Sequence, residues 1–335
     1  MRKFEKDTKP DKPVHLDFIS PGAIGNMPSW LLNKFHPWIT ASTRAIPAPD
    51  HLHEIHKLPP ELKKFTLPLV PNTDFMHAWQ AGGHPEHRYE RKFTDLKFIA
   101  NQSFGSPGIF TFDRDINTPQ DFIGKKIGVA RKESSNWIWT YALLNDAWDI
   151  YDKVKLVTCP TPKHGLGKLL NGEIDATMFG CFLMETIEGN GFSTMPGLEN
   201  FKGKRINWIS ISLEDVEKIN KANPWKTGRV LMPKGSIRAE GPEALDPEED
   251  IGLVGFTDAL CGWDSTDDAV VYELLKFMDE KSALWPEVSG GRPMSLARMS
   301  RFPGLTEDMV HPAALRYYKE KGISIGGQVK LRRMG

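Results

Sequence analysis

The stretch Lys125–Thr158, KKIGVARKESSNWIWTYALLNDAWDIYDKVKLVT, contains the pattern that decides the fold. Short runs rich in β-branched and aliphatic residues stand at its two ends, at 125–130 and 153–158, and predict two strands. Between them Ser134, Ser135 and Asn136 suit a helix N-cap, and the apolar residues that follow recur at helical spacing. Because a strand, a helix and a strand in this order form a parallel pair with a crossover helix, the stretch predicts an α/β fold.

The same alternation extends from this stretch in both directions. Further strands are expected at 14–20, 38–43, 65–70, 96–100, 108–112, 175–179, 207–211 and 252–256. Helices are expected at 27–35, 51–58, 72–81, 166–170, 182–187, 213–220, 265–278 and 307–321. Since Pro68 cannot donate a ladder hydrogen bond, the strand that contains it is predicted to lie at a sheet edge.

Length and charge restrict the class of protein. The 335 residues suggest about two domains. Lys plus Arg and Asp plus Glu each number 43, so the net charge is +0 and a nucleic-acid binder, which needs a basic face, is not expected. No run reaches the ~18 apolar residues of a membrane-spanning helix. The start at 1–13 lacks the apolar core of a secretory signal, so the chain is periplasmic or otherwise extracytoplasmic if a leader was trimmed, and cytoplasmic if Met1 is the true start.

Four strings, in this order along the chain, carry a resemblance to a known family. They are TPQDFIGKKIGV at 118–129, LLNGEIDAT at 169–177, DDAVVYEL at 267–274 and HPAALRYYKEKG at 311–322. Together they resemble the TAXI family of solute receptors, which serve tripartite ATP-independent periplasmic (TRAP) transporters. The last string is the most specific, and the resemblance covers roughly residues 14–322.

This resemblance implies a fold and a division into lobes. The expected architecture is a two-lobed, type II periplasmic-binding-protein-like α/β fold, with parallel-rich sheets, flanking helices and a central cleft that closes on its ligand about a hinge. Lobe one is then discontinuous and takes in 14–112 and 226–335, whereas lobe two is 113–225. Residues 1–13 form a polar N-terminal arm.

Candidate ligand-binding residues follow from the predicted strand ends, because ligands of open α/β sheets lie beyond the carboxyl ends of the strands. They are Ser20, Gly22, Ala23, Asn26, Arg44, Asn72, Thr73, Asp74, Gln102, Ser103, Phe104, Arg131, Ser134, Ser135, Asn136, Trp137, Phe179 and Gly180. A carboxylate would suit Arg44 or Arg131, since guanidinium binds carboxylate bidentately. Phe104 or Trp137 could stack on an apolar ligand body. Plainer alternatives are helix capping for the Ser and Asn residues, surface charge for the arginines and core packing for Trp137.

The sequence gives little support for a cysteine-based site, a metal site or a serine nucleophile. The three cysteines are far apart and form no C-x-x-C pair, so buried inert thiols are expected. The histidines at 51–56 and 77–87 lack the spacing of a zinc site. No G-x-S-x-G string is present. We therefore expect no catalytic residue, no metal and no cofactor.

Three functions remain open from the sequence. The leading one is a non-enzymatic solute-binding protein for a small organic acid, with aromatic and amino acids among the candidates, whose partners are the membrane components of a TRAP transporter if the chain is exported. The second is an intracellular enzyme or ligand sensor on the same fold, for which Asp74 is the best carboxylate. The third is an assembly protein that uses the N-terminal arm and the acidic loop at 238–250.

Overall fold

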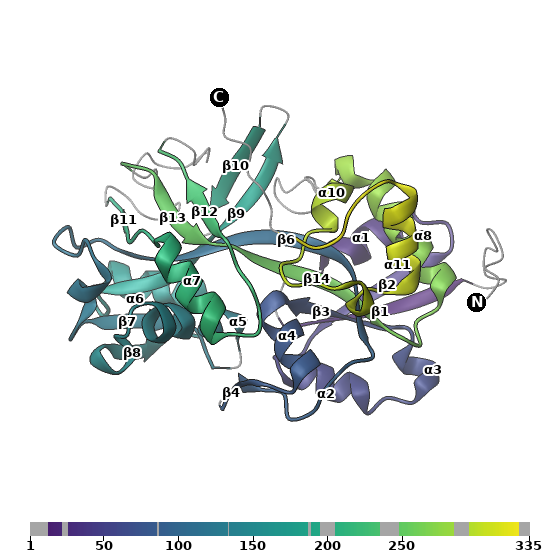
Figure 1. Ribbon diagram of the computed structural model, residues 1–335, viewed down its shortest axis with the longest axis horizontal. Helices are drawn as coiled ribbons and strands as arrows, with labels where there is room; N and C mark the ends of the chain where they lie inside the picture. Colours follow the sequence, from purple (N-terminus) through teal and green to yellow (C-terminus); the bar gives the residue numbers. More distant parts are fainter. Residues whose placement is uncertain are drawn as a thin grey trace. The chain divides into compact units, whose positions relative to one another are not determined.

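The computed structural model describes residues 13–21, 26–85, 87–132, 134–186, 189–194, 205–234, 248–284 and 295–327 (Figure 1). Most of the predicted N-terminal arm, the candidates Gly22 and Ala23, and most of the acidic loop therefore lie outside the described residues. Contacts divide the chain into two compact units. Unit 1 is Met1–Gly82, Tyr89–Gln102 and Asp258–Gly327, and unit 2 is Gly83–Arg88, Ser103–Thr257 and Gln328–Gly335.

Unit 1 is built on a sheet with the strand order β2-β1-β3-β14-β6. The strands are β1 (Val14–Ser20), β2 (Ile39–Ala45), β3 (Thr66–Pro71), β14 (Phe256–Trp263) and β6 (Leu96–Thr111), the last two of which continue into unit 2. β1 runs parallel to both β2 and β3, whereas β14 is antiparallel to β3. Parallel neighbours require crossover connections, and helices supply them. These helices are α1 (Asn26–Phe35), between β1 and β2, and α2 (Asp50–His56) and α3 (Pro60–Lys63), between β2 and β3. Another helix, α4 (Asn72–Gln80), follows β3.

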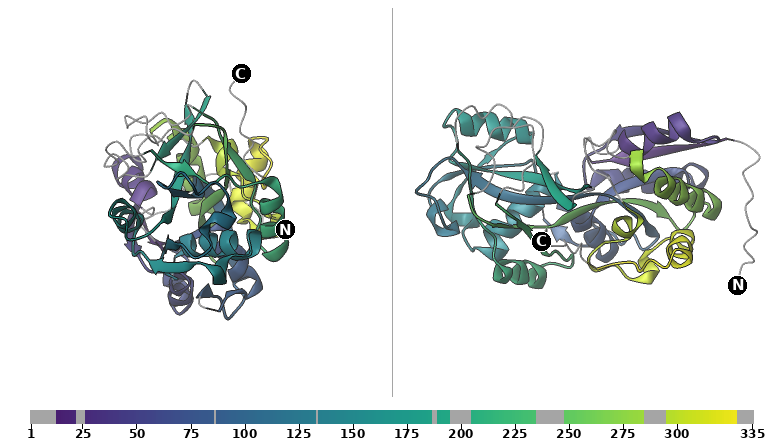
Figure 2. Two further views of the ribbon diagram at one scale, coloured as in Figure 1. Left: turned by 90° about the vertical axis from the view of Figure 1, so that its left-hand side faces the viewer. Right: turned by 90° about the horizontal axis from the view of Figure 1, so that it is seen from above.

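The C-terminal part of the chain completes unit 1. Its helices are α8 (Asp268–Glu280), α10 (Leu296–Met299) and α11 (Pro312–Glu320), with single 3₁₀ turns at Ser282–Leu284 and Glu307–Met309. α8 and α11 pack against each other (Figure 1). The two views of Figure 2 show the purple α1 beside the yellow-green α8. Helices thus join the N-terminal and C-terminal parts of the chain in one unit.

Unit 2 contains the stretch 125–158, which forms the predicted strand, helix and strand. β7 (Lys126–Val129) and β8 (Lys155–Thr158) are parallel, and α5 (Ser135–Tyr141) continues into a π-helical segment, Ala142–Ala147, between them. The strand order is β6-β9-β7-β8, where β9 is Ala176–Thr186. The remaining elements are β4 (Gly83–His84), β5 (His87–Arg88), β10 (Gly189–Thr194), β11 (Asn207–Trp208), β12 (Arg229–Met232), β13 (Ile251–Val254), α6 (Pro162–Leu170), α7 (Leu213–Ala222) and 3₁₀ turns at Pro119–Phe122 and Tyr151–Lys153. The predicted two-lobed α/β fold class is confirmed.

Three local predictions are wrong. The helix expected at 182–187 is the end of strand β9, which pairs with β6 and β10. The strands expected at 96–100 and 108–112 are one strand, β6. The stretch between them, which contains Gly105, resembles a loop, but an added Cβ on Gly105 would lie 1.9 Å from Cε1 of Phe256. Glycine is therefore required there by close packing rather than by a turn.

The strand β3 lies inside the sheet, so the edge position predicted from Pro68 is also wrong. Pro68 pairs with β1 only, because the ladder between β3 and β14 begins at Leu69. Although Pro68 has no N–H, the ladder between β3 and β14 therefore loses no hydrogen bond. Among the described residues, no helix is both long enough and apolar enough to cross a membrane.

Candidate functional site

Polar side chains gather in unit 1 where the parallel strands β1 and β3 end. Asn72, Thr73 and Asp74 form the first turn of α4, directly after Pro71, and all three are fully buried. Ser20 is the last residue of β1 and is also buried. Asp258 of β14 is buried as well and pairs with Pro71. This edge of the sheet is the position that ligands of α/β proteins occupy.

The Asp74 carboxylate is held by two hydroxyl groups. Its Oδ1 accepts a hydrogen bond from the Tyr89 hydroxyl at 2.8 Å, and its Oδ2 accepts one from Thr73 Oγ1 at 3.1 Å. Burial and, to a smaller extent, the Asp74 carboxylate hold the pKa of Tyr89 well above its usual value. Tyr89 therefore stays protonated and keeps donating, which fixes the orientation of the carboxylate.

Strand β6 brings two neutral amides to the boundary of unit 1. Asn101 and Gln102 have 0% exposed surface. Among the residues that the structure describes, neither the amide nitrogen nor the amide oxygen of either side chain has a hydrogen-bond partner. A buried polar atom without a partner costs about 1–3 kcal/mol, so four such atoms on consecutive residues require an explanation. A ligand that supplies the missing partners is one.

The two amides point to opposite faces of the sheet, because side chains alternate along a strand. Gln102 shares its face with Phe98, whose ring lies 5.3 Å from that of Phe302. Phe302 in turn lies 5.2 Å from Phe75 of α4. Gln102 therefore shares a face of β6 with Phe98, which Phe302 links to α4, the helix whose first turn holds the buried Asp74.

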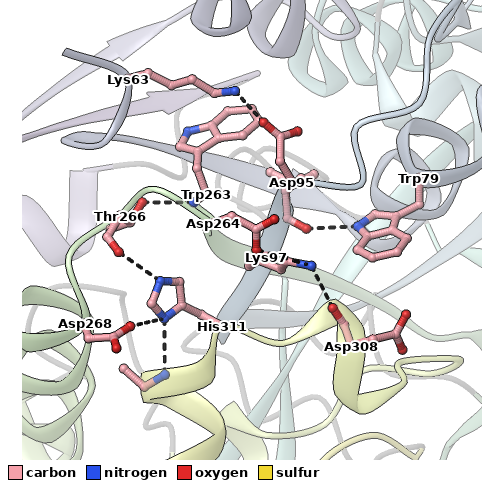
Figure 3. Close-up of polar contacts among 12 residues, drawn as sticks. Lys63, Trp79, Asp95, Lys97, Trp263, Asp264, Thr266, Asp268, Asp308 and His311 are labelled. Atoms are coloured by element: carbon pink, nitrogen blue, oxygen red, sulfur yellow. Dashed lines mark hydrogen bonds and ion pairs between the residues drawn. The ribbon is translucent and has the colours of Figure 1, made fainter. Parts of the chain in front are cut away.

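At the opposite end of β6, the charged side chains have hydrogen-bond or ion-pair partners (Figure 3). Lys97 donates to the carbonyl of Asp308 at 2.8 Å, lies 3.4 Å from Asp264 and stands over the ring of Trp79. Next to it, Lys63 pairs with Asp95. These charged groups all have partners, so this cluster acts as scaffold and needs no ligand.

His311 forms the edge of the same cluster (Figure 3). Its ring is buried, with Nε2 3.2 Å from the carbonyl of Thr266 and Nδ1 accepting from the backbone N–H of Ala313. Burial lowers the pKa of His311, while Asp268 raises it to a smaller extent. The neutral ring therefore serves as the N-cap of α11.

In unit 2 the candidates around α5 include a confirmed helix cap. Ser134 Oγ accepts from the backbone N–H of Asn136 at 3.3 Å, while Ser135 and Asn136 are half-buried. Trp137 is 1% exposed and stacks on Tyr141, as the core-packing alternative requires. The ligand-binding role of these residues stays a prediction.

The two candidate arginines are exposed. The Nε of Arg44 donates to Asp17 Oδ2 at 2.8 Å, and this ion pair stands on the exposed surface of β1 and β2. Arg131 lies between β7 and α5. Neither guanidinium is shown in contact with the buried polar residues of unit 1.

The remaining candidates are placed by their strands or helices. Ser103 and Phe104 are buried in β6, immediately after Gln102. The backbones of Asn26, Phe179 and Gly180 lie in α1 and β9, but their side chains are outside the described part. Asn101 was not among the predicted residues. The available signal was an Asn-Gln pair inside an otherwise apolar strand.

In the part of the chain that the structure describes, we find neither a metal site nor a reactive thiol. No group of three or more His, Cys, Asp or Glu side chains there could hold a metal ion. Cys159 and Cys261 are free and buried. Burial raises the pKa of both thiols, for Cys261 well above its usual value. Thiols of this kind are poor nucleophiles.

Residues 72–322 match the family described as NMT1-like. The chain belongs to the NMT1-like family. The match begins with Asn72, at the first turn of α4, and so takes in the buried polar residues of α4 and β6. A comparison of this NMT1-like chain with curated proteins finds no match.

Solved structures resemble the chain at low identity. MatC from Rhodopseudomonas palustris with bound malate is 12% identical, with a TM-score of 0.49, over 93% of this chain and 97% of that one. The periplasmic aliphatic sulphonate binding protein SsuA from Escherichia coli is 14% identical, with a TM-score of 0.43, over 92% and 84% of the two chains. Rpa4515 from R. palustris with adipate is 10% identical, with a TM-score of 0.47, over 81% and 84%.

Proposed function

We propose that this NMT1-like protein is a solute-binding protein that captures a small organic acid, and that it serves a TRAP-type transporter as a TAXI receptor. The observation that carries the proposal is the buried amide of Gln102, whose polar atoms have no hydrogen-bond partner among the described residues. The resemblance of four sequence strings to the TAXI family supports the same function.

The chemistry of an amide explains why an acid is a suitable ligand. The NH₂ group of Asn or Gln donates two hydrogen bonds and its oxygen accepts two. A ligand carboxylate supplies acceptors for the donors, and a ligand hydroxyl, amino or protonated carboxyl group supplies a donor for the amide oxygen. A ligand that carries both kinds of group removes the cost of leaving the amide unpaired, and the free energy so recovered contributes to binding.

Gln102 is the amide that we assign to the ligand. It shares a face of β6 with Phe98, which Phe302 links to Phe75 of α4, and the first turn of α4 carries the buried Asn72, Thr73 and Asp74. The orientation of Asp74 is already determined by Tyr89 and Thr73. A rigid polar group of this kind suits recognition, because little conformational entropy is lost when a ligand binds.

The enzyme and sensor alternative rests on Asp74, and its geometry argues against general-base chemistry. Both carboxylate oxygens already accept hydrogen bonds from side chains of the protein, and these donors compete with a substrate proton. A general base must reach a substrate proton within hydrogen-bond distance. We therefore keep binding as the proposed function.

The test is a search for the bound acid. Native mass spectrometry of protein purified without refolding shows whether an acid co-purifies. A thermal-shift screen then compares carboxylic acids with and without an aromatic ring, and calorimetry measures Kd for the best compound. We expect one chemical class to raise Tm, because a ligand that binds only the folded state stabilises it.

The variant Gln102→Met separates this site from non-specific binding. Methionine keeps the length of the side chain and removes its polar atoms, so we expect at least a tenfold loss of affinity with an unchanged fold. Gln120→Met, on the exposed turn at 119–122, is the matched control and should bind as the parent does. If no acid binds the parent protein, or if both variants bind equally well, the proposal is wrong.

A further inference from the structure

An exposed aromatic pair stands on the surface of α1. Trp30 is 40% exposed and Phe35 is 38% exposed, and their rings meet edge to face with centroids 6.0 Å apart. The other large exposed apolar side chains in the described part are Leu62, Ile123 and Leu213, none of them aromatic and each on a different element. The pair is therefore the one place where exposed aromatic surface is continuous among the residues that the structure describes.

Two lysines lie over this pair. The Lys34 Nζ is 4.6 Å from the centroid of Trp30 and 5.1 Å from that of Phe35. The Lys281 Nζ, at the end of α8, is 5.9 Å from the centroid of Phe35. Within the described ranges, neither ammonium has a carboxylate partner. The four residues, called the α1 patch below, combine aromatic surface with two uncompensated positive charges.

The Asp279 carboxylate, near the end of α8, is directed away from Lys281. Lys281 is one helical turn after Phe277, which contacts His36 next to α1. Asp279 instead accepts from the Tyr317 hydroxyl of α11 at 2.8 Å and pairs with Lys321. His36 adds no charge near neutral pH, because burial lowers its pKa to about 4. The α1 patch is therefore cationic.

We propose that the α1 patch is a docking surface for anionic lipid headgroups. Tryptophan is enriched at membrane–water interfaces, where its apolar body and N–H donor are both accommodated. Lysine is attracted to anionic lipid and is depleted in protein–protein interfaces, so the pairing of Lys with Trp favours lipid over an acidic protein partner. The inference goes beyond the proposed function, since it requires no ligand in the site at β6.

Such a surface gives weak, reversible association. A basic residue near an anionic membrane contributes about fivefold in binding, equivalent to about 1 kcal/mol. Two lysines therefore give roughly 25-fold preference for anionic over zwitterionic vesicles at low salt. Weak binding of this kind would confine a solute-binding protein to the membrane surface, where its transporter resides, without immobilising it.

The test is co-sedimentation of the full chain with vesicles of phosphatidylcholine alone or of phosphatidylcholine and phosphatidylglycerol in equal amounts, at low and high salt. We expect binding to the anionic vesicles only, reduced at least tenfold by the double variant Lys34→Gln/Lys281→Gln. Trp30→Ser should also weaken it. Neither lysine has an ion-pair partner in the described part, so the double variant should fold normally, which circular dichroism checks.

Matched controls are Lys218→Gln and Leu213→Ser, which change an exposed lysine and a 64% exposed leucine on α7 of unit 2. Both should bind vesicles as the parent does. Equal binding to the two kinds of vesicle, no binding to either, or patch variants that bind like the parent would each overturn the proposal. In the second case an acidic protein surface becomes the better partner. Because acid binding is measured without vesicles, this failure is distinguishable from failure of the proposed function.

Discussion

Replacing the Gln102 amide by an apolar group of similar length should stabilise the ligand-free protein. In the structure this amide has 0% exposed surface and no hydrogen-bond partner for either polar atom. Most core substitutions destabilise a protein, but Gln102→Met removes a desolvation penalty and creates no cavity. The expected direction is therefore opposite to the usual one.

The magnitude follows from the cost of an unpaired buried amide. That cost is about 1–3 kcal/mol. Imperfect packing of the thioether lowers the gain, so we expect the free energy of unfolding to rise by about 1–2 kcal/mol. For a chain of 335 residues, each 1 kcal/mol raises Tm by about 1–2 °C. The ligand-induced shift should decrease at the same time, because a saturating ligand at 100 times its Kd contributes about 2.7 kcal/mol to the parent.

The assay is urea unfolding of the parent and of Gln102→Met, each with and without the acid identified in the screen. Asn101→Leu, on the opposite face of the same strand, is the comparison that separates stability from binding. It should raise the stability of the ligand-free protein without the loss of affinity seen for Gln102→Met. If Gln102→Met lowers the free energy of unfolding by more than about 1 kcal/mol, the amide has a partner in solution, and the reasoning that assigns it to a ligand is refuted.

Three further predictions concern pH, packing and the buried carboxylate. Burial in the folded protein lowers the pKa of His36 from 6.5 to about 4, so folding favours the neutral ring. The resulting contribution of His36 to the stability of the folded protein is complete above pH 6.5 and is lost as the pH falls toward 4. Allowing for partial exposure, the loss is about 1–2 kcal/mol, and the difference in Tm between pH 7 and pH 4.5 should be smaller for His36→Gln than for the parent. Gly105→Ala should destabilise the protein by at least about 1–3 kcal/mol, since its Cβ would overlap an aromatic ring. Gly167→Ala in α6 is the control, because a Cβ there meets nothing within 4 Å, and it should leave the protein equally stable or more stable in the same urea assay. Tyr89→Phe removes one donor from the buried carboxylate of Asp74 and should lower Tm by an amount equivalent to about 1–3 kcal/mol; an unchanged Tm would mean that this hydrogen bond is dispensable.

The sequence alone was sufficient to predict a helix or strand where the residues of that element determine its structure. The strand-helix-strand unit at 125–158 was predicted because β-branched runs flank a segment with helical spacing, and β7, α5 and β8 follow that pattern. Ser134 was predicted as a cap because its hydroxyl reaches the backbone of its own helix, and it does. Asn72–Asp74 do open a helix, as expected, but the helix N-cap is Pro71 and no side chain caps it, so the capping role expected of these residues is wrong.

Only the tertiary structure decided the features that depend on distant partners. Residues 182–186 have apolar side chains that suit a helix or a strand, and pairing with β6 and β10 selects the strand. The string 103–106 was predicted as a loop, but it lies inside β6, where the Phe256 ring packs too closely against Gly105 for a side chain to fit. The absence of hydrogen-bond partners around Asn101 and Gln102 likewise depends on every segment that packs around β6. Composition and periodicity thus determine which elements form, because backbone propensity is local. Burial and hydrogen-bond satisfaction arise between segments far apart in the chain, and they identify the candidate site.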